Sequence, residues 1–454
     1  TYVLIIFLFL GSLFLTNCKK ETIIEDSSAV VEFSKDTLMF DTVFSTIGST
    51  YRRFTVRNPY NQKIIISNIR LEKGTGSMFR INVDGVPTVN ITDVEIEAKD
   101  SIFILAEVTV DPNNLNNPFV VEDRITFNTN GNFQTVYLVA WGQNAYFHHN
   151  ELVCGETWAV DKPHVLYGIT AVGYPKLDSG CTLTIPAGAK IYAHTDAVLY
   201  VYKSSLNING IYGNEVVFEG DRREAGFQNA PGQWFGIRFT QPKSSVINYA
   251  IIKNGTAGIY IDTADGSDFV DIDYTISKNH TYAALFAQGA RIKAENSLFI
   301  NSGLHCAGLK IGGDYEFNHC TFGNYWTNST RTTPAVLVNN WYEDNTGITH
   351  HRPIINAEFT NCIIYGANDD EILFDTIPGS APNYSLNYCV IKTTKILNSH
   401  YSNIKNNVDP RFKATDDFHL LPSSIAIGWS DNLTTSNDLD NEFRTSHNAG
   451  CYEK

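Results

Sequence analysis

One short phrase recurs between residues 247 and 393, and this repeat constrains the fold more than any other feature of the chain. Its clearest copies are INYAIIKN, IDYTISKN, AENSLFIN and FNHCTFGN, followed by FTNCIIYG and LNYCVIKT. The equivalent central residues are Ala250, Thr275, Ser297, Cys320, Cys362 and Cys389, spaced 25, 22, 23, 42 and 27 residues apart. A period of 22 to 27 residues made of short strands indicates a stacked β solenoid.

Stacking accounts for the residue types in the repeat. Each unit adds one strand to each face, about 4.8 Å from the previous one, and the stacked units share one apolar core. We interpret Cys320, Cys362 and Cys389 as small buried side chains rather than disulfide partners, because free cysteine packs as a small hydrophobe. A row of asparagines ends four copies: Asn254, Asn279, Asn301 and Asn324. Such a row could bind a sugar, but we favour a turn ladder, where Asn tolerates left-handed backbone.

Residues 29–143 carry a different pattern. Seven or eight short β-branched or aromatic runs alternate with turns such as Asp111-Pro112-Asn113, which predicts an antiparallel β-sandwich. The phrase FTVRNPYNQKIIISNIRL, residues 54–71, resembles the immunoglobulin-like domains of the HYDIN/ASPM type. The resemblance implies a module that spaces or docks other domains. Together with the repeat, it predicts an all-β chain.

Longer phrases around the repeat carry a second resemblance. Residues 156–194 and 216–239, and the ending DPRFKATDDFHLLPSSIAIG at 409–428, resemble a family of Bacteroidota right-handed β-helix lipoproteins. This implies a right-handed parallel β-helix over 144–454 with a C-terminal closing segment, and no single activity. Within the phrase, we expect Glu219 to Glu224, Gln233 and Trp234 to set a loop against a coil by charge pairs and aromatic packing.

The first residues predict a targeting signal. Thr1 to Thr16 are almost entirely apolar, yet shorter than the roughly 20 residues of a membrane-spanning helix, which indicates a secretory signal. Leu15-Thr16-Asn17-Cys18 resembles a bacterial lipobox. That resemblance implies removal of residues 1–17, acylation of Cys18 and a polar tether over 18–28. We expect lipid anchoring in the outer membrane, with the cell surface favoured over the periplasmic face. An ordinary signal peptide with an incidental cysteine is the alternative.

Net charge and cysteine content limit the classes of partner, disulfide and metal site that the chain can have. A net charge of −14 and a pI near 5.3 argue against nucleic acid, since phosphate binding needs a basic face. If Cys18 is acylated, seven cysteines remain, an odd number. Export permits disulfides, and Cys154 with Cys181 is the best pair. No Cys/His cluster has zinc-site spacing, so we expect no structural metal of that type.

The 42-residue gap between Cys320 and Cys362 is the place where function is most expected. Residues 325–353 add about 20 residues to a normal unit, and insertions on solenoids often form the binding surface. The candidate binding face consists of Tyr325, Trp326, Arg331, Trp341, Tyr342 and Arg352. Aromatic and arginine side chains dominate binding hot spots, and aromatic rings also stack on sugars. The alternative is an extended coil whose aromatics cap the solenoid.

No catalytic motif is complete, so no catalytic residue is assigned. Glycosidases need paired carboxylates, for which Glu316, Glu358, Asp314 and Asp369-Asp370-Glu371 are the candidates. Asp262, Asp265 and Asp268 are weak calcium candidates, and we favour a solvated loop between strands for them. We therefore expect an interaction or structural lipoprotein that binds an outer-membrane partner protein or a glycan, without a cofactor. A polysaccharide lyase or glycoside hydrolase acting in a groove of the β-helix is the alternative.

Overall fold

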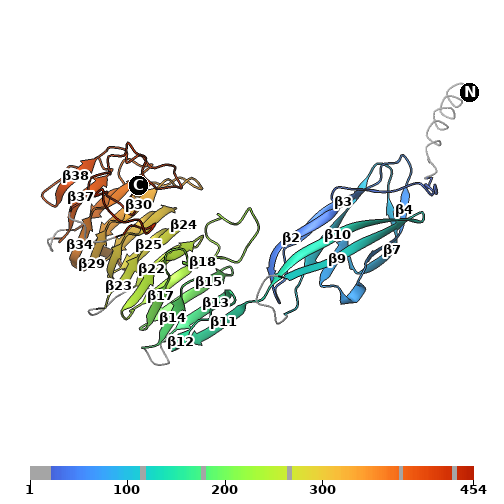
Figure 1. Ribbon diagram of the computed structural model, residues 1–454, viewed down its shortest axis with the longest axis horizontal. Helices are drawn as coiled ribbons and strands as arrows, with labels where there is room; N and C mark the ends of the chain where they lie inside the picture. Colours follow the sequence, from blue (N-terminus) through green and yellow to red (C-terminus); the bar gives the residue numbers. More distant parts are fainter. Residues whose placement is uncertain are drawn as a thin grey trace, which may run out of the picture. The chain divides into compact units, whose positions relative to one another are not determined.

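The structure is a computed structural model that describes residues 22–112, 119–174, 180–262, 268–377, 382–431 and 437–453. Cys18 and the predicted signal therefore lie outside the described residues. The chain forms two compact units, Thr1–Asn144 and Ala145–Lys454, divided one residue from the predicted boundary. Regular structure is almost entirely β-strand (Figure 1), so the chain is all-β.

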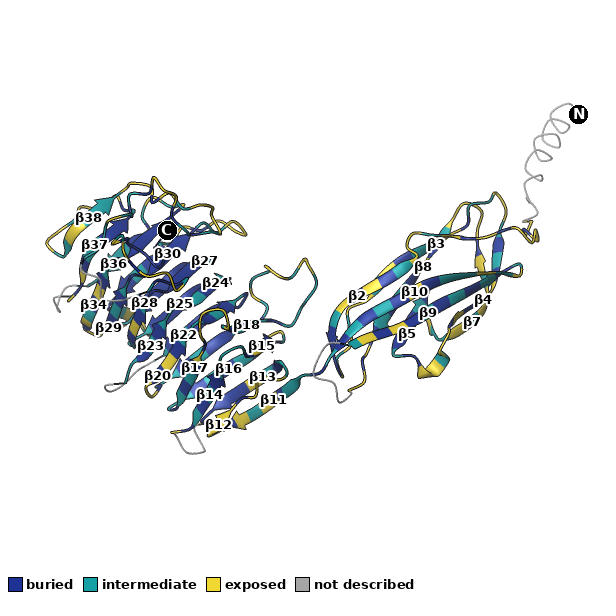
Figure 2. Ribbon diagram, in the orientation of Figure 1, coloured by how far each residue is buried: buried dark blue, intermediate teal, exposed yellow. Residues whose placement is uncertain are grey.

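The first unit contains two five-stranded sheets. One has the order β1 (Glu32–Phe33), β3 (Arg52–Arg57), β8 (Ser101–Val108), β5 (Phe79–Val83) and β6 (Val86–Thr88). The other has the order β2 (Thr37–Phe44), β10 (Asn132–Gln143), β9 (Phe119–Thr129), β4 (Ile64–Leu71) and β7 (Asn90–Ile96), and a short 3-10 turn, η1, covers Gly74–Gly76. Alternate residues of both sheets enter one buried cluster (Figure 2), as the period of two along a strand requires.

The second unit is built on one 26-stranded parallel sheet, in which most strands pair with the strand three places later. Row A is β11 (Tyr146–Val153), β13 (His164–Val172), β15 (Lys190–Ala193), β18 (Val216–Gly220), β21 (Ala250–Lys253), β24 (Ile276–His280), β27 (Leu298–Ser302), β30 (Thr321–Asn324) and β35 (Ile363–Gly366). Row B is β12 (Glu156–Thr157), β14 (Thr182–Pro186), β17 (Ser205–Asn209), β20 (Ser245–Asn248), β23 (Val270–Asp273), β26 (Arg291–Glu295), β29 (Gly313–Asn318), β34 (Ile354–Thr360), β37 (Ser385–Ile391) and β38 (Tyr401–Asn406). Row C continues from β13 through β16 (Val198–Tyr202), β19 (Gly236–Thr240), β22 (Ala257–Asp262), β25 (Ala283–Gln288), β28 (His305–Lys310), β31 (Val336–Asn339) and β36 (Ile372–Asp375).

The inward positions of each row form ladders of apolar residues. In row B, Ile208, Ile247, Ile272, Ala294 and Phe317 follow one another in register, and all are buried. Each of these side chains has an apolar neighbour on the strand before it and on the strand after it, so the core continues from unit to unit. A disulfide joins Cys154 and Cys181, the pair favoured from the sequence, near the start of this sheet.

The central residues of the repeat form a ladder of weak donors. Ser297 Oγ donates to Glu295 O at 2.8 Å and to Ile272 O at 3.1 Å. Thr275 uses its hydroxyl in the same way, and Cys320, Cys362 and Cys389 place their thiols against the two equivalent carbonyls. These three cysteines are free and buried, which confirms the interpretation from the sequence. The thiols add to carbonyls that already accept a backbone N–H, as Asn318 O does from Asn296 at 3.1 Å.

This geometry predicts that Cys362→Ser folds with a change in unfolding free energy within about 1 kcal/mol, because Ser297 already makes the same two bonds. Cys362→Leu should cost about 1–3 kcal/mol, since the site is close-packed. Denaturant unfolding measures both. Cys306→Ser is the matched control, because the Cys306 thiol reaches a single carbonyl, that of Gly323. If Cys362→Ser lowers the unfolding free energy more than Cys362→Leu does, the donor ladder is contradicted.

The asparagine row is a turn feature, as favoured from the sequence. Asn254, Asn279 and Asn301 have φ values of 65°, 62° and 48°. Asn324 does not share this backbone conformation, but its buried amide donates to Ser302 O at 3.0 Å. The row thus satisfies backbone groups where each row A strand ends.

The chain after β38 folds back over the outer face of row A. Phe418, Leu439 and Tyr452 pack against Leu298 and Ile300 in one cluster. A second cluster places Leu420, Ala426 and Ala449 against Ile363, Tyr365 and Val390. Arg444 is buried there and donates to Asn296 Oδ1 at 2.7 Å and Gly450 O at 2.9 Å. The described parts of the closing segment, residues 407–431 and 437–453, therefore cover row A from β27 onward, and Ile276 of β24 packs against the same cluster.

Candidate functional site

The outer face of row A between β15 and β24 carries polar side chains beside an apolar ladder of Val217, Ile251 and Ile276. Tyr192 is in register with Glu219, and Lys253 is in register with Lys278. An ion pair of 2.6 Å between Glu219 Oε2 and Lys253 Nζ joins the two pairs. Burial and the charge of Lys253 lower the pKa of Lys278. This part of the face therefore holds two adjacent ammonium groups, of which Lys253 pairs with the Glu219 carboxylate.

A loop over residues 221–234 rises beside this face. Its base is Trp234, which is buried and donates its indole N–H to Lys253 O at 3.0 Å. Gln233 Nε2 donates to Phe227 O at 2.6 Å and to Ala230 O at 2.7 Å, which closes the loop on itself. Trp234 also stacks on Phe218 at 6.3 Å, and Glu219 and Glu224 form ion pairs, so the aromatic packing and charge pairs expected here from the sequence are present.

The asparagine row holds the far side of the same loop. Asn254 Nδ2 donates to Gln228 O at 2.8 Å, and Asn279 Nδ2 donates to Asn229 O at 2.7 Å. A second bond of 2.7 Å links Asn279 Nδ2 to Asn254 Oδ1. Two successive turns of the sheet therefore position one loop wall.

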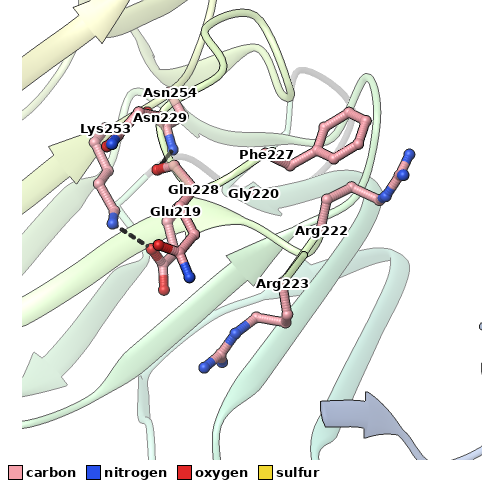
Figure 3. A pocket seen from close by; sticks show the side chains of 9 residues that line it. All are labelled: Glu219, Gly220, Arg222, Arg223, Phe227, Gln228, Asn229, Lys253 and Asn254. Carbon is pink, nitrogen blue, oxygen red and sulfur yellow. Dashed lines mark hydrogen bonds and ion pairs between the residues drawn. The ribbon is translucent and has the colours of Figure 1, made fainter. Parts of the chain in front are cut away.

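The loop and the strands enclose a pocket of about 270 Å³, shown in Figure 3. Its lining residues are Glu219, Gly220, Arg222, Arg223, Phe227, Gln228, Asn229, Lys253 and Asn254. The Arg222 guanidinium lies 3.7 Å from the centroid of the Phe227 ring and forms an ion pair of 3.1 Å with Glu224. The Arg223 guanidinium lies 4.7 Å from the Tyr192 ring. We call this the loop pocket.

Stacked rings continue the face toward the start of the sheet. His149 stacks on Tyr167 at 4.7 Å, and Tyr167 stacks on His194 at 4.6 Å. His194 Nδ1 lies 2.6 Å from Asp221 Oδ2, and burial raises the pKa of Asp221. Planar rings beside fixed donors and acceptors are the elements that recognise the apolar faces and hydroxyl groups of a sugar.

The structure divides the predicted binding face. Trp341 and Tyr342 lie in a hairpin of β32 (Trp341–Glu343) and β33 (Thr349–His351), and Arg352 follows it. Tyr325 instead packs 6.0 Å from Phe418 of the closing segment, and Trp326 Nε1 donates to Ser329 Oγ at 2.9 Å. The aromatic residues of the insertion therefore do not form one surface.

Arg331 is a correction to the predicted face. Its side chain is buried and forms a two-pronged ion pair with Glu371, with contacts of 2.6 and 2.8 Å. Glu371 Oε2 also accepts the backbone N–H of Ala335 at 2.8 Å. The pair shields the guanidinium from solvent and ties the loop to row C, so Arg331 has a structural role.

The hairpin overhangs a smaller pocket of about 170 Å³ on row C, lined by Asp262, Gln288, Ile311, Tyr342 and Arg352. Tyr342 stacks on His350 at 5.0 Å, and His350 Nε2 lies 2.6 Å from Asp344 Oδ2. The Trp341 indole donates to Asp375 Oδ2 at 3.1 Å. Contacts inside the hairpin and one hydrogen bond to Asp375 of β36 thus fix its position. We call this the hairpin pocket.

The candidate glycosidase carboxylates separate into two groups. Glu316 and Glu358 are in register on β29 and β34 and line a pocket of about 240 Å³ with Lys293 and Glu295. Asp314 instead pairs with Arg291 at 2.7 Å, and Asp370 accepts hydrogen bonds from Thr393 and Thr394. Next to this pocket, burial and then the charges of Glu295 and Asp271 raise the pKa of Asp273 to about 6.

The calcium candidates have protein partners where they are described. Asp262 lies 3.6 Å from Arg238, and Asp268 Oδ1 accepts the Ser244 hydroxyl at 2.7 Å. Asp265 lies outside the described residues. Within the described ranges, no three His, Cys, Asp or Glu side chains gather as a metal ion would require. The calcium alternative stays a prediction.

The loop pocket was not singled out as a binding site from the sequence. Its residues lie between positions 219 and 254, and the charged run Asp221-Arg222-Arg223-Glu224 indicates equally a solvated loop. Two arginines, four and five residues before Phe227, are the signal that could have suggested it.

Comparisons with known proteins add little to this geometry. No protein-family model matches the chain, and no curated protein matches it. Among solved structures, a family 123 glycoside hydrolase from Clostridium perfringens is similar over 25% of this chain and 26% of that one. The identity is 9% and the TM-score 0.18, which supports no conclusion about fold or function. Separately, no helix in the described ranges is long and apolar enough to cross a membrane.

Proposed function

We propose that this chain is a lipid-anchored outer-membrane protein, more specifically a surface-facing one, that binds a glycan without transforming it. Cys18 would carry the lipid, the first unit would space the second from the membrane, and the second unit would present its outer faces. The lipobox-like ending at Cys18 and the acidic, non-nucleic-acid composition support this assignment.

We also propose that the second unit is a right-handed parallel β-helix and the first unit an immunoglobulin-like sandwich. Three rows of strands, each pairing in parallel with the strand three places later, are what a right-handed parallel β-helix would produce. Two five-stranded sheets around one buried cluster support an immunoglobulin-like sandwich in the first unit. A second unit made of stacked strands suits a chain-like ligand.

The loop pocket is the observation that carries the proposal. From β27 onward the closing segment covers row A with apolar contacts, whereas beside β18 and β21 the same face has a pocket with a ring, guanidinium groups and amides. Its volume of about 270 Å³ lies near the lower end of small-molecule sites, which suits a single sugar unit of a longer chain.

Glycan binding is tested on an oligosaccharide array, followed by calorimetry with the best ligand. We expect Phe227→Ala and Arg223→Gln each to weaken binding about tenfold, or about 1.4 kcal/mol, because each removes one face of the loop pocket. Tyr212→Ala is the control, since Tyr212 is exposed and does not line the pocket. If no glycan binds, or if the control weakens binding as much, the proposal fails.

Anchoring and orientation are tested separately. We expect radiolabelled palmitate to enter the wild-type protein and not Cys18→Ala, because acylation requires the cysteine thiol. Protease added to intact cells should cleave the wild-type protein if it faces outward. Survival in intact cells with cleavage after lysis would place it on the periplasmic face.

A second candidate, a glycoside hydrolase, is favoured by Glu316 and Glu358. They are in register on adjacent strands and line one pocket. Retaining enzymes use two carboxyl groups about 5–5.5 Å apart. Hydrolysis lost in both Glu316→Gln and Glu358→Gln, with unchanged folding, would favour this candidate over binding alone.

A further inference from the structure

The hairpin pocket is lined by a cation, Arg352, that takes part in no ion pair among the described residues. Lys310 does not line the pocket, but it is in register with the lining residue Gln288 on the neighbouring strand and likewise takes part in no ion pair among the described residues. In the loop pocket, Lys253 pairs with Glu219 and Arg222 with Glu224, while Arg223 lies over the Tyr192 ring.

The Gln288 amide is a third donor at the hairpin pocket. The Tyr260 hydroxyl donates to Gln288 Oε1 at 2.8 Å. This bond fixes the amide orientation and leaves the Gln288 NH₂ group for a ligand. The Tyr260 ring is itself held between Arg238, at 5.0 Å, and Phe286, at 5.1 Å. Arg352, Lys310 and the Gln288 amide therefore offer donors only.

One carboxylate lines the pocket, and its charge is offset. Asp262 Oδ2 lies 3.6 Å from Arg238 Nη2. Of the two charged residues that line the pocket, Asp262 is paired with Arg238, whereas Arg352 has no ion-pair partner among the described residues. An arginine in this state attracts an anionic group to this position.

Two further residues shape the pocket: Tyr342 offers an aromatic ring to the ligand, and Gly289 leaves space for the Arg352 guanidinium. Tyr342 is exposed, and its stack on His350 keeps the ring in place. Gly289 has φ of +59°, and a Cβ there would stand 3.1 Å from Arg352 Nη1. The absence of a side chain at Gly289 thus lets the Arg352 guanidinium lie against the sheet.

We propose that the hairpin pocket binds the carboxylate of a hexuronate residue, with Arg352 as a two-pronged donor, Lys310 and Gln288 as further donors, and Tyr342 against the sugar ring. A planar carboxylate matches the fork of an arginine, and a pyranose ring presents an apolar face to a tyrosine. This inference rests on the proposed glycan binding and assigns the class of glycan, an acidic one.

The test compares uronate-containing oligosaccharides with their carboxyl-reduced forms on the full-length protein. We expect the acidic form to bind at least tenfold tighter, and Arg352→Gln to remove that difference while Arg352→Lys retains part of it. Tyr260→Phe should weaken the acidic ligand alone, because Gln288 then loses its fixed orientation. Lys190→Gln is the matched control, since Lys190 is exposed on row A and does not line the hairpin pocket.

The outcomes separate the two proposals. If reduced and acidic forms bind equally and the loop-pocket variants still weaken both, the uronate assignment is overturned and glycan binding stands. Binding of neither form by wild-type protein would overturn both. Preference for the acid that survives Arg352→Gln would place the carboxylate elsewhere and overturn the site.

Discussion

Phe418→Ala is expected to destabilise the second unit by about 3–5 kcal/mol, because the ring fills the contact between the closing segment and row A. The ring packs so closely on Gly323 that a Cβ at Gly323 would stand 1.9 Å from Phe418 Cε1. Chemical denaturation, read out by near-ultraviolet circular dichroism, measures the loss. Phe443→Ala is the control, since Phe443 lies in the same segment and is 66% exposed.

The contact with Gly323 permits a sharper version of this experiment. Gly323→Ala alone should destabilise the protein, since the phenyl ring must move out of its site. In the double variant with Phe418→Ala, most of the cost of Gly323→Ala should disappear, because the ring that the new Cβ would strike has been removed. Strictly additive losses would show that the two residues do not share one contact. A protein that unfolds unchanged with Phe418→Ala would contradict the role given to the closing segment.

Acidification is expected to destabilise the second unit as pH falls below about 6.5. Burial lowers the pKa of His280 to about 3, that of His319 to about 3 and that of His164 to about 4. The unfolded chain binds protons near pH 6.5 and the folded chain does not, so stability present above 6.5 is lost as pH falls toward 3–4. Each histidine contributes about 1.4 kcal/mol per pH unit in that window.

His280 shows why protonation is resisted. Its Nδ1 accepts the backbone N–H of Gly255 at 3.1 Å, and its Nε2 lies 3.1 Å from Ser277 Oγ, which itself donates to Ala284 O. The neutral ring therefore carries its proton on Nε2, and a second proton on Nδ1 would break the bond to Gly255.

His280→Asn isolates this contribution, because the asparagine carbonyl can accept the Gly255 N–H but cannot titrate. The difference in unfolding free energy between wild type and variant should fall by about 4 kcal/mol between pH 7 and pH 3.5. Carboxyls with raised pKa values, such as Asp273 at about 6, act in the opposite direction but are common to both proteins. A difference that stays flat over this range would refute the assignment.

The sequence by itself determined the repeat and the chemistry of its turns. Equivalent positions such as Ser297 and Cys320 make the same bonds because units of similar length return to the same place in each layer. The turn role of Asn254 and the pairing of Cys154 with Cys181 also follow from local residue types and spacing. These properties depend on backbone conformation and period, which are encoded locally.

Only the tertiary structure decided what covers each outer face. The alternation of residues along β27 shows which side chains point outward, but not that Phe418, more than a hundred residues later, buries them. Likewise, the composition of the insertion suggested one binding face, whereas a buried carboxylate at Glu371 withdraws Arg331 from solvent. Because contacts between distant segments depend on where the whole chain returns, the two pockets could be located only after the rows were stacked.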